Sequence, residues 1–313
     1  MSSYRFSDKV QILTPSILIT GGSGLLAVNW ASALSAKYDV TLAMHNRQVS
    51  LPNTRSIDVD LSSVASIEKV LEKLGINLVI HAAAMTNIEI CEKSPLAAHH
   101  VNVDLAANVA KASKASGAAL VHISTDHLFD GSKSLVDEEE PVKPLNVYSR
   151  TKADAELMVL KIRPDALVIR TNFYGWGTSY RSSFSDFIIT SLKANRSIGL
   201  FSDVYFTPIR VDILQDVVFK LWSGRYSGIF NVVSDQRISK FDFGLMVATK
   251  FRLNSKLIES TKFASRSDLV PRPQDLSLSN DKTCLTLGLS LGSSSAHLTR
   301  MARLTKKPEV AIL

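Results

Sequence analysis

Apolar runs that are rich in β-branched residues alternate with helix-like segments over the first half of the chain. The segment "SSVASIEKVLEKLG" has helical periodicity and ends at Gly75, a residue typical of a helix C-terminus. Continuously apolar strands separated by helices indicate a parallel sheet that is covered on both faces. We therefore predict a Rossmann-type, doubly wound α/β domain over residues 14–175. Its expected strands are 16–20, 39–45, 56–60, 77–84, 119–126 and 165–172.

The second half is less regular. Its hydrophobic pattern predicts helices near 182–195, 211–223 and 239–251, and short strands near 228–233 and 256–258. We expect residues 176–295 to form a smaller C-terminal α/β substrate-binding lobe over the carboxyl edge of the sheet, with the ligand pocket between the two parts. Residues 296–313, which include "RMARLTKK", are expected to be a solvated basic tail.

The composition is that of an ordinary soluble globular protein, with 313 residues that are 45% hydrophobic and 21% charged. No apolar run approaches the roughly 20 residues of a membrane span, and no apolar signal core precedes the first strand. The two cysteines, Cys91 and Cys284, are far apart and lack ligand spacing. These features predict a cytoplasmic protein in a reducing compartment, without membrane attachment or a metal site.

The net charge is +7, but the basic residues are scattered along the chain. Such an excess of positive charge could favour nucleic-acid binding, and it equally suits an enzyme whose ligands carry several phosphates. Charge alone does not decide between these roles, and nucleic-acid binding has no other support. We predict small-molecule ligands and no nucleic-acid partner.

A glycine turn, "TGGSGLLA", joins the first expected strand to the first helix. Gly21 can make the tight turn, Gly24 lets the backbone approach a pyrophosphate, and the small Ala27 lets the helix pack on the sheet. The helix N-terminus then attracts phosphate. A glycine turn without a ligand is the alternative. The expected cofactor contacts here are Gly21, Ser23, Gly24, Leu25 and Leu26.

The second strand ends in "AMHNRQ", about where dinucleotide-binding folds distinguish the two nicotinamide cofactors. An acid there binds a ribose 2′-hydroxyl, whereas an arginine accommodates a 2′-phosphate. This chain has Asn46 and Arg47 and no acid. The pattern favours NADP(H) over NAD(H), although Arg47 could also be an exposed loop cation.

The run "LNVYSRTKADAE" sets Tyr148 four residues before Lys152. Any helix brings such a pair onto one face, so the spacing alone decides nothing. Reduction of a ketone, however, needs a proton donor at the developing oxyanion, and a nearby ammonium favours the phenolate and lowers a tyrosine pKa. Thr125, or next Ser124, could supply a second hydrogen bond from the end of the fifth strand. Both hydroxyls could instead merely satisfy strand-end backbone groups.

Taken together, these blocks resemble the extended short-chain dehydrogenases/reductases, and most of all the dTDP-4-dehydrorhamnose reductase group. The resemblance spans about residues 16–290. Three positions depart from the family pattern, namely Ala27, His127 (usually Tyr) and Phe173 (often Trp). The blocks that carry the resemblance are "LVIHAAAMTNIEICEKSP", "NVDLAANVAKAS" with Asn102, "HISTDHLFDG", "PLNVYSRTKADAE", "VIRTNFYG", "FTPIRVDILQDV" and "RPQDLSLSNDK".

The resemblance implies roles for further residues. Thr125, Tyr148 and Lys152 would be catalytic. Tyr148 and Lys152 would also contact the cofactor, with Lys152 holding the nicotinamide ribose. Further cofactor contacts would be Asp60 and Leu61 at the adenine and Ala82, Ala83 and Ala84 along the trough. The substrate would meet Thr125, Asp126, Asn172, Arg210 and Arg272.

The predicted function is NADPH-dependent reduction of a 4-keto nucleotide sugar. A nucleotide-sugar epimerase is an alternative, whereas "STDHLF" lacks the glutamate that follows Asp126 in dehydratases of the superfamily. Some members of the group are non-catalytic regulatory subunits that bind NADP and a partner enzyme, and this role stays open. Analogy with the family suggests a homodimer.

Overall fold

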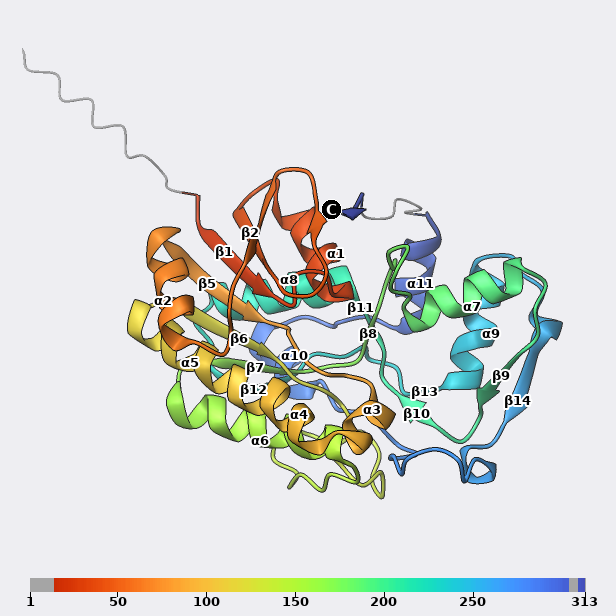
Figure 1. Cartoon of the computed structure of the whole chain (residues 1–313). Helices are drawn as coiled ribbons and strands as arrows, with labels where there is room; N and C mark the ends of the chain where they lie inside the picture. The colour runs from red at the N-terminus through yellow and green to blue at the C-terminus, as the bar shows by residue number, and fades with distance from the viewer. Residues whose placement is uncertain (1–13, 304–308, 313) are drawn as a thin grey trace, which may run out of the picture.

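A seven-stranded parallel sheet forms the centre of the chain (Figure 1). The computed structural model describes residues 14–303 and 309–312. The strand order is β12-β7-β6-β5-β1-β2-β4, so the direction of winding reverses on either side of β1. The α/β, Rossmann-type prediction is confirmed. The strands are β1 (Ser16–Thr20), β2 (Asp39–Met44), β4 (Thr54–Asp58), β5 (Ile76–His81), β6 (Ala119–Ile123), β7 (Leu167–Arg170) and β12 (Gly228–Asn231).

Helices cover both faces of this sheet because its strands are apolar on both sides. Ile17 and Ile19 of β1 pack with α1 (Leu25–Leu34) and α8 (Val211–Ser223), whereas Leu18 between them faces the opposite layer. That second layer consists of α2 (Val64–Lys73), α5 (Leu105–Ser116) and α6 (Val147–Ile162). Gly117, at φ 73°, ends α5 in the left-handed conformation.

The seventh strand corrects the expected division of the chain. We predicted a strand near 228–233 in the C-terminal lobe, but β12 pairs in parallel with β7 of the main sheet. α8 precedes it and packs against α1, so this strand–helix unit extends the doubly wound domain. Sequence periodicity identified both elements, but it carries no information about which sheet a strand joins.

The C-terminal lobe lies beside the main sheet (Figure 1). It has its own hydrophobic core. Phe243 is fully buried between Phe184, Phe206 and Tyr174. The lobe's helices are α7 (Phe184–Lys193), α9 (Lys240–Lys250) and α11 (Ser294–Arg303). Its paired strands are β9 (Ile198–Phe201) with β14 (Ile258–Thr261), and β10 (Tyr205–Phe206) with β13 (Ile238–Ser239).

The expected solvated tail is wrong for residues 296–303. These residues lie in α11, where Ser294, His297, Leu298 and Met301 are buried at helical spacing. Lys306 and Lys307 lie outside the described residues. Beyond them, β15 (Ala311–Ile312) pairs with β3 (Val49–Ser50), which contacts β4.

Short elements connect these parts. They are α3 (Ile88–Lys93), α4 (Pro95–His99), a π-helical turn (His100–Asp104), β8 (Phe173–Tyr174) paired with β11 (Ile209–Arg210), 3₁₀ turns (Ser255–Leu257 and Phe263–Ser265) and α10 (Asp281–Leu287). Among the residues described, no helix has the length and apolarity needed to cross a bilayer.

Candidate active site and cofactor cradle

The expected cofactor residues follow neighbouring strands at the carboxyl edge of the sheet. Gly21 follows β1, Arg47 follows β2, Asp60 follows β4 and Ala82 follows β5. Because the strand order is β5-β1-β2-β4, these four segments lie side by side. Open α/β sheets bind ligands at this edge, where the winding reverses.

The glycine turn has the geometry of a phosphate cradle. Gly21 has φ 68°, and a side chain there would lie 3.0 Å from the backbone of Ala83. The Gly24 amide donates to the Gly21 carbonyl (2.7 Å), and a Cβ at Gly24 would lie 2.9 Å from the same oxygen. No side chain caps α1, and its first turn contains no acid. The first-turn amides are therefore available to an anion.

The outer cofactor candidates are solvent-accessible. Asn46 and Arg47 are exposed, and the Arg47 guanidinium carbon lies 4.3 Å from the ring centroid of Tyr180. Asp60 accepts from the backbone and hydroxyl of Ser62, and these hydrogen bonds lower its pKa. Leu61 packs partly buried beside the α2–α5 layer.

The three predicted catalytic side chains come together in the structure. Thr125 lies just beyond β6, and Tyr148 and Lys152 lie on the first turns of α6, whose N-terminus is capped by Asn146. They are 5%, 8% and 3% exposed, respectively. The Thr125 hydroxyl donates to the Asp126 carboxylate and accepts from the His127 amide, each at 3.3 Å. The Lys152 ammonium donates to the Ile123 carbonyl at 2.8 Å.

Burial, rather than Lys152, dominates the acidity of Tyr148. Desolvation raises the pKa of Tyr148, and only the nearby Thr125 hydroxyl opposes this effect. The predicted lowering of this pKa by Lys152 gains no support from the structure. Desolvation also lowers the pKa of Lys152 to about 8, against the opposing charge of Glu156. The phenol thus stays protonated at neutral pH.

A π-helical turn fixes the position of α6. Within it, Asn102 accepts from the Met85 amide (2.7 Å) and donates to the Met85 carbonyl (3.1 Å) and the Thr151 hydroxyl (2.9 Å). Single π-turns inside helices are frequent at functional sites. This buried amide joins the loop after β5 to the catalytic helix between Tyr148 and Lys152.

Polar groups from both parts of the chain surround Asp126. Asn172 donates to one Asp126 carboxylate oxygen at 2.6 Å, and His127 lies edge-on to Tyr148 at 5.8 Å. Burial lowers the pKa of His127, and the nearby Arg272, which pairs with Glu89, lowers it further.

Sequence reasoning missed Lys240, which enters this cluster from the lobe. Its ammonium lies 4.4 Å and 4.9 Å from the ring centroids of Phe206 and Phe184. Burial lowers its pKa, and the charge of Asp126 opposes that effect. Nothing local in "RISKFDFG" signals this role, because the approach depends on how the lobe folds back.

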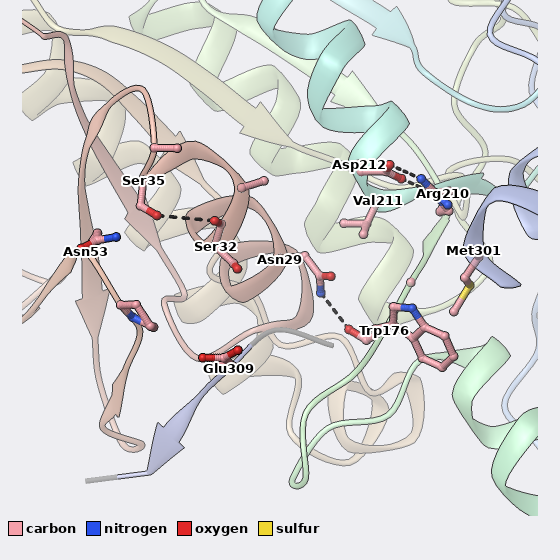
Figure 2. Close-up of a pocket in the computed structure, with 14 residues that line it drawn as sticks. Asn29, Ser32, Ser35, Asn53, Trp176, Arg210, Val211, Asp212, Met301 and Glu309 are labelled. Atoms are coloured by element: carbon pink, nitrogen blue, oxygen red, sulfur yellow. Dashed lines mark hydrogen bonds and ion pairs between the residues drawn. The ribbon is translucent and has the colours of Figure 1, made fainter. Parts of the chain in front are cut away.

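Arg210 is not part of this cluster. Its guanidinium pairs with Asp212 and lines a cavity of about 520 Å³ beside α1, together with Asn29, Trp176 and Met301 (Figure 2). Its predicted contact with the substrate gains no support from this position.

Two buried histidines lie beneath the catalytic helix. His81 and His122 are paired in register on β5 and β6, with their rings stacked at 5.4 Å. The Thr20 hydroxyl accepts from two amides, so its own proton goes to Nδ1 of His81 (2.8 Å), which leaves that ring protonated at Nε2. Desolvation and the charge of Lys152 lower the pKa of His81 to about 3 and also lower that of His122.

We expect this histidine pair to make the stability of the fold sensitive to acid. In the unfolded chain His81 takes up a proton near pH 6.5, whereas in the folded chain it does so only near pH 3. The stability that the neutral ring contributes above pH 6.5 is therefore lost as the pH falls toward about 3. We expect His81 alone to lower the free energy of unfolding by roughly 1 kcal/mol between about pH 7.5 and 5.5. Urea unfolding at both pH values measures this difference.

Two variants test the assignment to this pair. A His81→Gln/His122→Gln variant should show a flatter dependence of the free energy of unfolding on pH, whereas replacement of the exposed His100 should leave that dependence unchanged. An equal dependence on pH in all three proteins would contradict the assignment.

Comparisons with known proteins agree with this geometry. The family model described as "RmlD substrate binding domain" matches residues 15–306. The dTDP-4-dehydrorhamnose reductase of Aggregatibacter actinomycetemcomitans is 27% identical over 87% of this chain and 93% of its own. Methionine adenosyltransferase 2 subunit beta of Mus musculus is 26% identical over 79% of this chain and 75% of its own.

Among solved structures, the fold is similar to that of dTDP-4-dehydrorhamnose reductase from Bacillus anthracis in complex with NADP. The TM-score is 0.82 at 24% identity, covering 92% of this chain and 99% of that chain. With the glycine cradle and the Tyr148–Lys152 helix in place on this fold, and with nearly the whole chain matched, the protein belongs to the RmlD substrate binding domain family.

Proposed function

We propose that this protein is an NADPH-dependent reductase of a 4-keto nucleotide sugar. The observation that carries the proposal is the buried group of Thr125, Tyr148 and Lys152 beside an uncapped glycine cradle. A protonated phenol, a second hydroxyl and an ammonium at one site are what ketone reduction requires of a protein.

The cradle residues fit a nicotinamide dinucleotide, with Gly21, Ser23 and Gly24 at the pyrophosphate and Arg47 at the ribose 2′-phosphate. When bound, this cofactor supplies the hydride. The chain supplies the proton, because the phenol of Tyr148 is protonated at neutral pH and donates from its hydroxyl to the carbonyl oxygen. Thr125 stabilises the same oxygen with a second hydrogen bond. Lys152 contributes a positive charge one helical turn beyond Tyr148 on α6.

The substrate side of the site is formed by Asp126, Asn172, Arg272 and Lys240. Asp126 is fixed by Asn172 and can accept hydrogen bonds from sugar hydroxyls. Arg272 and Lys240 place two cations at the lobe, where they suit a diphosphate.

Turnover assays test the proposal directly. Purified protein is mixed with NADPH or NADH and a dTDP-4-keto-6-deoxy sugar, and the loss of reduced-cofactor absorbance is followed. NADPH oxidation that depends on the sugar is the expected result. If a sugar isomer forms with no net cofactor oxidation, the protein is an epimerase instead.

Arg47 should determine the cofactor preference. Arg47→Ala removes the cation expected at the 2′-phosphate, so we expect NADPH affinity to fall about tenfold or more, as for a lost hydrogen bond to a charged group. NADH affinity should change little, because NADH lacks that phosphate. Fluorescence titration with each cofactor measures both constants. Equal losses for the two cofactors would count against this role.

A regulatory subunit is the second candidate, and the similarity to a methionine adenosyltransferase beta subunit favours it. In that role the protein would bind NADP and a partner enzyme without turning over a sugar. The intact Thr125, Tyr148 and Lys152 side chains favour catalysis. Tight NADP binding without turnover of any 4-keto sugar nucleotide would favour the subunit role.

A further inference from the structure

A loop of the lobe, residues 175–183 between β8 and α7, reaches the cofactor edge of the sheet. The Trp176 carbonyl accepts from Asn29 of α1 at 2.9 Å, as the dashed line in Figure 2 shows. The Tyr180 hydroxyl donates to the carbonyl of Ser23, within the glycine turn, at 3.2 Å. Arg181 donates to the Thr86 hydroxyl beyond β5 at 3.2 Å. The loop therefore contacts both sides of the cofactor cradle.

Hydrogen bonds inside the loop hold its shape. One carboxylate oxygen of the buried Asp186 accepts from the Gly177 amide (2.6 Å) and the Ser183 amide (3.0 Å), and the Ser183 hydroxyl donates to the Gly175 carbonyl (2.6 Å). A side chain at Gly177 would come within 2.3 Å of the Arg181 carbonyl, so the turn has no room for one. The loop therefore holds Tyr180 in position before any ligand binds.

The ring of Tyr180 lies against Arg47. The guanidinium carbon is 4.3 Å from the ring centroid, within the range of a cation–π contact. Arg47 is exposed, and an exposed arginine loses considerable rotamer entropy when a ligand fixes it. A ring that already holds the guanidinium reduces this loss.

We infer that Tyr180 is a specificity-determining residue for the cofactor, which positions Arg47 to receive the ribose 2′-phosphate of NADPH. The inference rests on the cofactor named in the proposed function. The two parts of the side chain have separate roles. The ring positions the guanidinium, and the hydroxyl anchors the loop to the carbonyl of Ser23 beside the expected pyrophosphate position.

Cofactor titration without any sugar tests this inference. Tyr180→Leu removes the ring, and a lost cation–π contact corresponds to about three- to thirtyfold weaker NADPH binding. NADH binding should change less than twofold. Tyr180→Phe keeps the ring, so it should retain the preference for NADPH over NADH. Tyr226→Leu is the matched control, because Tyr226 lies just before β12, at the amino edge of the sheet, and should change neither constant.

A double-variant cycle separates positioning from simple contact. If Tyr180 acts through Arg47, Tyr180→Leu should have little further effect on NADPH binding in an Arg47→Ala background. Equal losses for both cofactors in Tyr180→Leu, additive losses in the double variant, or a wild-type protein with no preference for NADPH would each overturn the inference. A wild-type protein that prefers NADPH but reduces no sugar would instead refute the proposed reaction and leave this inference standing.

Discussion

Tyr148→Phe should lower kcat for the keto sugar by about 10²- to 10⁴-fold, the range typical of losing a positioned general acid. The substitution removes only the hydroxyl, so the packing of the buried ring against His127 is retained. The affinity for NADPH should change little, because the glycine cradle and Arg47 belong to other segments. Steady-state kinetics with NADPH and the sugar nucleotide give kcat, and a cofactor titration gives the affinity.

Thr125→Val provides a comparison for this result. It removes the second hydroxyl at the same oxygen, and we expect kcat to fall about 10²- to 10³-fold. Circular dichroism should show that both variants are folded. If Tyr148→Phe retained most of the wild-type kcat, Tyr148 would be excluded as the proton donor.

Glu156→Gln should cost about 3–5 kcal/mol in the free energy of unfolding, because it leaves the buried guanidinium of Arg170 without its counter-charge. The Glu156 and Arg170 side chains are each 4% exposed. Nε of Arg170 lies 3.1 Å from both Glu156 oxygens, and Nη2 lies 2.8 Å from one of them. Urea unfolding of the variant and the wild type measures the difference.

Two matched variants test the reason for that loss. Glu140→Gln breaks an ion pair with Lys133, whose side chain is 63% exposed, and should cost at most about 1 kcal/mol. Glu156→Leu/Arg170→Met removes both buried charges and should recover part of the loss. Similar costs for Glu156→Gln and Glu140→Gln would show that burial does not determine the strength of the pair. Because Glu156 raises the pKa of Lys152, its loss should also shift the pH profile of any activity to lower pH.

Much of the parallel sheet could be predicted from the sequence, because its signals are local. A continuously apolar strand needs no distant partner to be recognised, and six of the seven strands were placed within the first domain. The seventh, β12, was recognised as a strand and assigned to the wrong part, because pairing with β7 joins residues 61 positions apart, such as Asn231 and Arg170.

The residues of the candidate site also fall into two groups, those that local sequence motifs identify and those that only the structure identifies. Amino-acid type and spacing identified the glycine turn and the Tyr148–Lys152 pair, since each lies within a single turn or helix. Lys240 and Tyr180 could not be identified, because neither residue belongs to a local sequence motif that indicates a role in the site. Lys240 acquires a role only where α9 begins beside Asp126, and Tyr180 only where a lobe loop crosses to Arg47.

The sequence by itself thus determined the class of fold, the cofactor cradle and the chemistry of the catalytic helix, because these depend on interactions between neighbours along the chain. Only the tertiary structure decided which distant residues complete the site, which strand forms the edge of the sheet beside β7, and why the pKa of Tyr148 is raised. Those properties depend on burial and on contacts between segments far apart in sequence. Desolvation raises the pKa of Tyr148 more than any charge near it changes that pKa, and the extent of burial is known only once the chain has folded.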